Sequence, residues 1–437
     1  MKSQVILDYQ QADGRAGYAV RALLKFEGDS VENPREVPLN LSLVLDRSGS
    51  MSGEKLEHAR KAAAFLVRRL RPADVVSVVA YDDSVTTVAE PATGAAQAGL
   101  AREIETIECG GSTNLSGGWL RGRDLVTRNG SHTPDASAEP GDASRGSAIN
   151  RVILMTDGHA NVGITDPVRL LGLCSNGLKQ GVTTTTIGFG GDYDEELLRG
   201  MAEAGGGHSY YIENPDQAPG VFEEEIEGLL SLAAQNIEVK IKPEPFVDLV
   251  NVHNDYQSHG NTDGITVAVG DLYARDPKSL LIEFFVADVE TIGDRSIAVI
   301  SVTADVVGAD GGVQRQEIRI PVAATLSAEG REEPEIQRTK ILLDAAKARD
   351  EARVRGQRGD YGGAAAMLRE ASVACASMPS GGSVMEEQAV DLMAMASKYE
   401  NEEVTLSDEK YLYQRAYNAR RGKERYEKKI SRVKPQK

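Results

Sequence analysis

The sequence has few of the residues on which several common architectures depend. Its 437 residues include three cysteines, Cys109, Cys174 and Cys375, which lie far apart and form no CxxC pair. An odd number of dispersed cysteines fits neither a disulfide framework nor a zinc cluster, so we expect isolated reduced thiols. The six histidines are also scattered and form no HExxH pair, which disfavours a histidine-based zinc enzyme.

Long apolar runs are missing as well. No stretch of 18 or more apolar residues occurs, so the sequence predicts no membrane span. The first residues, MKSQVILDYQQADG, contain only a short apolar run and do not resemble a secretory signal. We therefore expect a cytoplasmic protein. The net charge of −17 at pH 7 argues against specific nucleic-acid binding.

What is present is an ordinary globular composition, with 41% hydrophobic and 26% charged residues and enough length for two or three domains. From residue 38 to about 235, short apolar runs alternate with amphipathic helical segments. This alternation predicts an α/β domain with a doubly wound, mostly parallel sheet. The expected strands are 39–45, 75–80, 85–88, 149–155, 182–189 and 208–212. The expected helices are 54–70, 97–107, 115–127, 167–179, 195–204 and 218–232. Residues 129–148, rich in Gly, Ser, Pro and Asp, indicate a surface loop.

The flanks of this domain have a period of two, which is typical of half-buried strands. Apolar and polar residues alternate over 18–26 and again over 237–242, and four more β-like runs follow before residue 332. Residues 1–37 are too short to fold alone. We therefore expect 1–37 and 236–332 to form one antiparallel β-sandwich into which the domain 38–235 is inserted.

Residues 333–437 are predicted to form a C-terminal helical domain with a basic, tyrosine-containing tail that starts near Lys410. The favoured interpretation of the tail is an amphipathic helix that packs its tyrosines on the body. The alternatives for the tail are binding to an acidic protein, RNA or an anionic membrane.

Three polar segments follow expected strands or precede a helix. Residues 46–51 (DRSGSM) come directly after the first buried strand, 110–114 (GGSTN) precede a helix, and 156–158 (TDG) follow the strand 149–155. In an open α/β sheet, ligands bind beyond the carboxyl ends of the strands. We therefore expect the three segments to converge.

The side chains in these segments suit a hard divalent cation, because carboxylate and hydroxyl oxygens are the ligands that Mg²⁺ prefers. Only two of the five groups are negative, so the bound metal would keep positive character and exchangeable water. A carboxylate from a partner is the natural replacement for that water. The five expected metal residues are Asp46, Ser48, Ser50, Thr113 and Asp157.

This set closely resembles the metal-ion-dependent adhesion site of von Willebrand factor type A (VWA) domains, with the D-x-S-x-S motif, the distant Thr and the distant Asp all present. The surrounding phrases ILMTDG and GGSTNLSGG are typical of bacterial members. The resemblance covers about residues 38–235. It implies direct metal contact by the Ser and Thr residues, contact through water by the two Asp residues, and a partner Asp or Glu that completes the shell. Mg²⁺ is the leading metal, with Mn²⁺ or Ca²⁺ as substitutes.

We therefore expect a non-enzymatic adaptor or scaffold from a bacterial cytoplasm that binds a partner carboxylate through the cation. Four residues are expected at the partner-binding rim: Arg47, Met51, Asn114 and His159. One alternative is a regulatory subunit of an AAA+ ATPase complex, because many cytosolic VWA proteins work beside such motors. Another is an aspartate-dependent phosphohydrolase, which is disfavoured because position 48 is Ser and not the acid/base Asp that such enzymes use. A secreted adhesin is disfavoured by the missing signal and disulfides.

Overall fold

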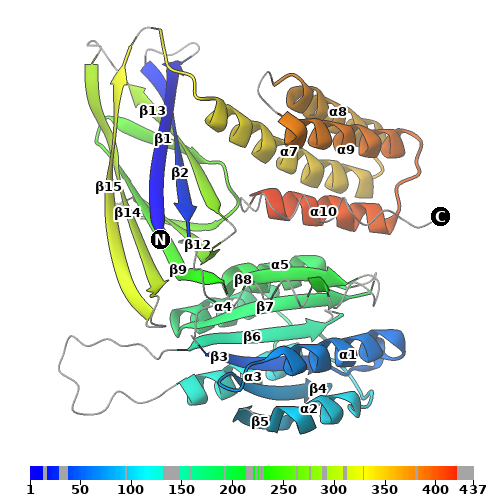
Figure 1. The fold of residues 1–437 in the computed structure, drawn as a ribbon. Helices are drawn as coiled ribbons and strands as arrows, with labels where there is room; N and C mark the ends of the chain where they lie inside the picture. The colour runs from blue at the N-terminus through cyan, green and yellow to red at the C-terminus, as the bar shows by residue number, and fades with distance from the viewer. Residues whose placement is uncertain are drawn as a thin grey trace, which may run out of the picture.

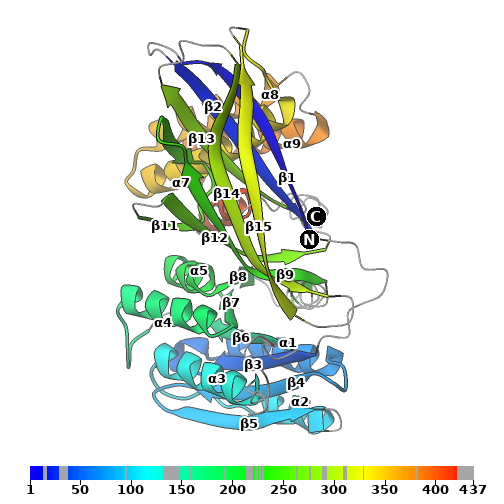
Figure 2. The ribbon, with the colours of Figure 1, turned by 90° about the vertical axis from the view of Figure 1, so that its left-hand side faces the viewer.

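The structure is a computed structural model, and Figures 1 and 2 show its three parts: a mostly parallel sheet with its helices, two antiparallel sheets, and a bundle of C-terminal helices. It describes residues 1–12, 17–28, 38–93, 96–130, 148–157, 160–190, 193–212, 220–221, 225, 228, 231–261, 264–274, 277–287, 293–308, 313–327, 329–378 and 382–420.

A six-stranded sheet forms the centre of the α/β part, in the order β5-β4-β3-β6-β7-β8. All neighbours run parallel except β5, an antiparallel edge strand. The strands are β3 (Leu39–Asp46), β4 (Val75–Tyr81), β5 (Val85–Thr93), β6 (Ile149–Thr156), β7 (Val182–Phe189) and β8 (Gly206–Ile212). Every residue of β3 is buried, as a strand covered on both faces requires.

Helices cover both faces of this sheet. Leu41, Leu43 and Leu45 of β3 belong to the hydrophobic cluster on the side of α1 (Glu54–Arg69) and α2 (Ala96–Glu105). Val44 points the other way, into the cluster formed with α3 (Leu115–Gly130), α4 (Pro167–Lys179) and α5 (Glu195–Ala204). The alternation of side chains along the strand therefore feeds two cores. The predicted α/β fold with a mostly parallel sheet is confirmed.

The remaining strands form two antiparallel sheets, β1-β2-β13-β10 and β11-β12-β9-β14-β15. β2 pairs with β13 over ten residues, so the N-terminal strands join the later β region as expected. Buried side chains from both sheets share one hydrophobic cluster. The strands are β1 (Lys2–Gln11), β2 (Gly17–Glu27), β9 (Leu232–Pro243), β10 (Val247–Val252), β11 (Gln257–Asn261), β12 (Gly264–Tyr273), β13 (Lys278–Ala287), β14 (Gly293–Val307) and β15 (Val313–Leu326).

Several local expectations differ from the structure. β10 and β11 were not predicted; β11 is a short edge strand of polar residues, and β10 is an irregular edge strand whose pairing with β13 shifts register. Leu232, expected to end a helix, begins β9 instead, because Leu232–Gln235 are buried between the α/β part and the antiparallel sheet. Most of the predicted helix 218–232 and loop 129–148 lies outside the described residues.

The C-terminal helices are α7 (Pro334–Gln357), α8 (Tyr361–Ala376), α9 (Gly382–Glu400) and α10 (Leu406–Arg420). α10 lies against α7 on one side and near α5 and β8 on the other (Figure 1). Tyr413 and Tyr417 are buried, and the guanidinium of Arg199 on α5 stacks over both rings. The expected packing of the tail tyrosines on the body is therefore observed up to Arg420; residues 421–437 lie outside the described range.

Candidate functional site

The three polar segments meet at the carboxyl edge of the parallel sheet. Gly49 N donates to the carbonyl oxygen of Gly111 at 2.8 Å, and Gly110 N donates to the carbonyl oxygen of Arg47 at 2.7 Å. The hydroxyl of Thr156, at the end of β6, donates to Asp46 Oδ2 at 2.6 Å. The segment after β3 is therefore tied to the glycine-rich segment on one side and to the end of β6 on the other.

Four of the five expected metal residues form one hydrogen-bonded chain. Asp46 Oδ1 accepts from Ser48 N at 2.8 Å, which fixes the turn after β3. The Ser48 and Ser50 hydroxyl oxygens lie 3.1 Å apart, and Ser50 Oγ donates to Asp157 Oδ1 at 2.9 Å. All four are buried except Ser50, which is exposed. The site therefore opens to solvent at Ser50.

The fifth residue, Thr113, is also buried and lies in the loop before α3. Its carbonyl oxygen accepts hydrogen bonds from Asn161 N and Val162 N, both at 3.0 Å. These bonds tie the Thr113 loop to the chain that follows β6. The structure thus brings all five residues to one edge of the sheet, in loops that are hydrogen-bonded to one another.

The site contains two carboxylates although it is largely buried. Asp46 and Asp157 are both buried. Burial raises the pKa of Asp46, the neighbouring Asp157 carboxylate raises it further, and hydrogen bonds from Thr156 and Ser48 act against this rise. Lys55, near the start of α1, places its ammonium 3.1 Å from Asp157 Oδ2. Two buried carboxylates this close to one another favour the binding of a cation.

The donor set suits a hard divalent ion better than a transition metal. It consists of carboxylate and hydroxyl oxygens, without sulfur or imidazole. Within the described part of the chain, no cluster of three or more His, Cys, Asp or Glu side chains could hold a metal ion, and this site has only two such residues. Its remaining ligands would be the hydroxyls of Ser48, Ser50 and Thr113, so the residues present fit Mg²⁺.

Two of the expected rim residues lie beside the site as partly exposed side chains. Arg47 Nη2 pairs with Asp82 Oδ2 at 3.0 Å, and Asn114 Oδ1 accepts from Gly117 N at 3.0 Å, at the start of α3. The expectation for Met51 is wrong: it is completely buried, because the turn Gly49–Met51 directs it into the core under α1. His159 lies outside the described residues.

Asp82 has a structural part in the site that the sequence reasoning missed. Asp82 was not among the expected site residues, yet it is buried and also accepts from Gly111 N at 3.3 Å. Burial raises its pKa, but hydrogen bonds from Ser84 and Gly111 and the charge of Arg47 outweigh this effect and lower the pKa to about 2. Asp82 therefore anchors the glycine-rich loop as a carboxylate. Because a side chain at position 110 would clash with this carboxylate, the loop needs glycine there.

Three further residues of the site had no role assigned from the sequence. Thr156 lies in the TDG segment and was not expected at the site, although its hydroxyl donates to Asp46. Tyr81, at the end of β4, donates to Asp46 Oδ2 at 3.4 Å, and its position at a strand end was the available signal. Lys55 could not be found from a pattern of oxygen ligands, because it contributes a positive charge.

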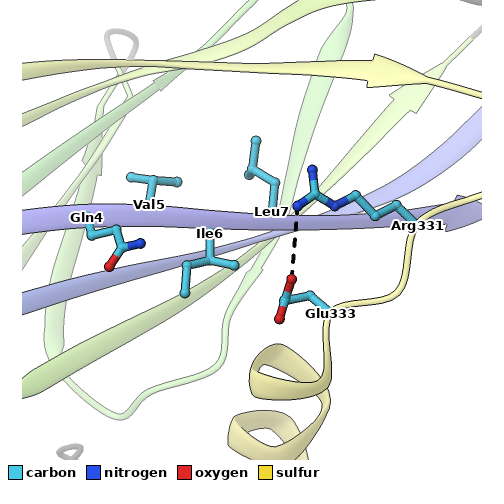
Figure 3. A pocket seen from close by; sticks show the side chains of 6 residues that line it. All are labelled: Gln4, Val5, Ile6, Leu7, Arg331 and Glu333. Atoms are coloured by element: carbon cyan, nitrogen blue, oxygen red, sulfur yellow. Dashed lines mark ion pairs between the residues drawn. The ribbon is translucent and has the colours of Figure 1, made fainter.

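A shallow pocket of about 380 Å³ lies elsewhere, along β1 (Figure 3). It is lined by residues 4–7 of this strand together with Arg331 and Glu333, whose charged groups are 4.0 Å apart. None of the expected site residues lines it. The pocket is therefore separate from the polar site at the edge of the parallel sheet.

Comparison with known proteins gives a family for the α/β part. The sequence profile of the von Willebrand factor type A domain matches residues 40–224. An uncharacterized protein of Synechocystis sp. is 27% identical over 380 residues, which cover 84% of this chain and 86% of that protein. The uncharacterized protein YfbK of Escherichia coli is 31% identical over 208 residues, 47% of this chain and 34% of that protein. Inter-alpha-trypsin inhibitor heavy chain H3 of Homo sapiens is 29% identical over 264 residues, covering 59% of this chain and 27% of its own length.

Solved structures show the same fold over most of the chain. A von Willebrand factor type A protein from Catenulispora acidiphila has a TM-score of 0.67 at 18% identity, and the match covers 89% of this chain and 88% of that one. The ArnB paralog VWA2 from Sulfolobus acidocaldarius has a TM-score of 0.58 at 17% identity, with 96% and 97% covered. The likeness therefore extends beyond the α/β part to the antiparallel sheets and the C-terminal helices.

Proposed function

Because residues 40–224 form a von Willebrand factor type A domain, we propose that this protein is an adaptor that binds a partner carboxylate through a divalent cation, Mg²⁺ in the first place. Domains of this family mediate protein–protein interactions and commonly bind a divalent cation. The observation that carries the proposal is the convergence of Ser48, Ser50 and Thr113 with two buried carboxylates. Mn²⁺ or Ca²⁺ can take the same oxygen ligands.

Each residue of the chain has a separate part in this proposal. The hydroxyls of Ser48, Ser50 and Thr113 hold the cation, and Asp46 and Asp157 supply the negative charge that attracts it. Because the hydroxyl ligands are neutral, the cation keeps a net positive charge and favours an anionic ligand from outside the protein. The exposed edge of the site at Ser50 admits such a ligand. When bound, the ion would act as a Lewis acid that accepts a carboxylate oxygen of a partner Asp or Glu as a ligand.

The proposal is one of binding and not of catalysis. A phosphohydrolase would need Asp46 as an accessible nucleophile, but its side chain is completely buried, and its two oxygens accept from Ser48 N and Thr156 Oγ1. No feature of the described residues favours the ATPase-linked alternative. Bacterial relatives from Synechocystis and Escherichia coli support the bacterial part of the expectation, and the cytoplasmic location stays a prediction.

We further propose that the two antiparallel sheets form a sandwich interrupted by the VWA domain. One hydrophobic cluster contains side chains of both sheets, as expected where two sheets face each other across a common core. In this arrangement the sandwich and the helices form a scaffold that presents the edge of the VWA sheet to a partner.

The test is capture of a partner from native lysate in Mg²⁺ or in EDTA. Thr113→Ala removes a proposed ligand, and Ser112→Ala, at an exposed neighbouring position, is the matched control. The proposal expects a protein captured by the wild type and by Ser112→Ala in Mg²⁺, and lost in EDTA or with Thr113→Ala. Capture that ignores both EDTA and Thr113→Ala would place the binding surface elsewhere.

A further inference from the structure

Lys55 forms an ion pair with Asp157, one of the two buried carboxylates among the five expected metal residues. It is the second residue of α1, and its ammonium lies 3.1 Å from Asp157 Oδ2. The other oxygen of Asp157 accepts from Ser50 Oγ at 2.9 Å. Both oxygens of this buried carboxylate are therefore engaged, one by an expected metal ligand and one by a charge from the chain itself.

The two partners of this ion pair differ in their freedom to move. The Asp157 side chain is 1% exposed and directly follows β6. The Lys55 side chain is 25% exposed and lies in the first turn of α1. The helix dipole disfavours an ammonium in the first turn of a helix. The flexible stem of lysine lets the ammonium leave, while Asp157 stays fixed.

The charge of Lys55 changes the electrostatic field that a divalent cation meets at the site. The hydrogen bonds to Asp46 come from the neutral groups Ser48 N, Thr156 Oγ1 and Tyr81 OH. The Lys55 ammonium therefore offsets one of the two negative charges of the site. An arriving cation finds a weaker field and meets the repulsion of the ammonium.

We propose that Lys55 is a tethered competitor of the divalent cation, which neutralises Asp157 in the metal-free protein and sets the cation concentration at which the site loads. This inference rests on the proposed metal site and adds a regulatory residue to it. With Lys55 present, the empty site is stable without metal, and loading follows the supply of free cation. Without the ammonium, the carboxylates attract the cation more strongly.

The test is a Mn²⁺ titration of the full chain, followed by the electron paramagnetic resonance signal of free Mn²⁺. Lys55→Met removes the charge and keeps the length of the side chain, and Lys55→Arg keeps the charge. Lys61→Met is the matched control, because Lys61 lies on the same helix, pairs with Glu57 and is 67% exposed. At the dielectric of a protein surface, loss of a unit charge beside a divalent ion is expected to tighten Mn²⁺ binding by about tenfold or more.

The inference expects tighter binding with Lys55→Met and values near wild type with Lys55→Arg and Lys61→Met. Lys55→Gln, which keeps a donor for Asp157 without the charge, gives the same test if Lys55→Met does not fold. Mn²⁺ affinity at or below the wild-type value in a folded neutral variant would overturn the role of Lys55.

Failure of the metal site itself gives a different pattern. If neither the wild type nor any Lys55 variant binds Mn²⁺, the proposed function falls and takes this inference with it. If the wild type binds, Thr113→Ala abolishes binding and Lys55→Met changes nothing, the inference alone falls. Binding by Lys55→Met but not by the wild type supports the inference in its strongest form.

Discussion

Replacing Arg151 by Met tests the buried ion pairs that connect the VWA domain to the antiparallel sheets. Arg151, on β6, is completely buried and donates to Glu225 Oε1 at 2.8 Å, and its other terminal nitrogen pairs with Asp271 of β12. Glu225 also accepts from Thr185 Oγ1 at 2.7 Å and from Tyr210 OH at 2.9 Å. Arg151→Met would remove the guanidinium that both buried carboxylates share. Breaking a buried pair in this way costs about 3–5 kcal/mol.

The pH dependence of this loss follows from Glu225. Burial raises the pKa of Glu225, but the charge of Arg151 and the surrounding hydrogen bonds outweigh it and hold the pKa well below its usual range. A carboxylate with a depressed folded-state pKa stabilises the protein above its unfolded-state pKa, about 4.3, and this contribution is lost as the pH falls. The cost of Arg151→Met is therefore expected to be largest near pH 7 and to shrink below about pH 5.

The assay is urea denaturation followed by the fluorescence of Trp119, the single tryptophan of the chain. Trp119 is buried on α3, and its indole N–H donates to Thr184 Oγ1, so its emission reports the unfolding of the VWA domain. Arg128→Met is the control, because Arg128 is exposed and pairs with Asp124 on the surface; it should cost less than about 1 kcal/mol. An Arg151→Met variant as stable as the Arg128→Met variant at pH 7 would refute the reasoning.

Three other changes give direct expectations. Asp82→Asn should reduce the stability of the protein by more than about 1 kcal/mol at pH 7. Because the low pKa of Asp82 stabilises the wild type only above the unfolded-state pKa, the melting temperature of Asp82→Asn should fall less than that of the wild type between pH 5 and pH 2.5. Equal slopes of melting temperature against pH for the two proteins would contradict this. Tyr413→Ala removes a buried ring under Arg199 and Arg353 and should reduce stability by about 3 kcal/mol. The amide hydrogens of α10 should then exchange faster, and trypsin should cleave α10 faster. An unchanged exchange rate would count against the packing of this ring. Thr156→Val removes the hydroxyl that binds Asp46 and should weaken Mg²⁺ binding in a calorimetric titration, whereas wild-type affinity would show that this hydrogen bond does not position Asp46.

The elements of the VWA domain were predictable because their signals are local. The continuous apolar run of β3 predicts a strand buried on both faces, and α4 has the bounds expected from Pro167 and the following periodicity. Parallel topology then places the ends of β3 and β6 at one edge, so the five polar residues could be expected together. Each step needs only the period of the chain and a rule of sheet geometry.

The remaining features depend on contacts between distant parts of the chain. Arg151 pairs with residues 74 and 120 positions away, and no local pattern connects them. Met51 follows the motif residues and was expected at the surface, yet a single turn of 3₁₀ helix directs it into the core. The polar sequence of β11 resembles a loop because an edge strand without a buried face needs no apolar alternation.

The central claim is that the five polar residues bind a divalent cation, and calorimetric titration of Mg²⁺ into the purified protein tests it most directly. The account predicts one binding site in the wild type and in Ser112→Ala, and loss of that site in Thr113→Ala with Trp119 fluorescence unchanged. Absence of Mg²⁺ binding to the wild type, or equal binding by Thr113→Ala, would contradict it.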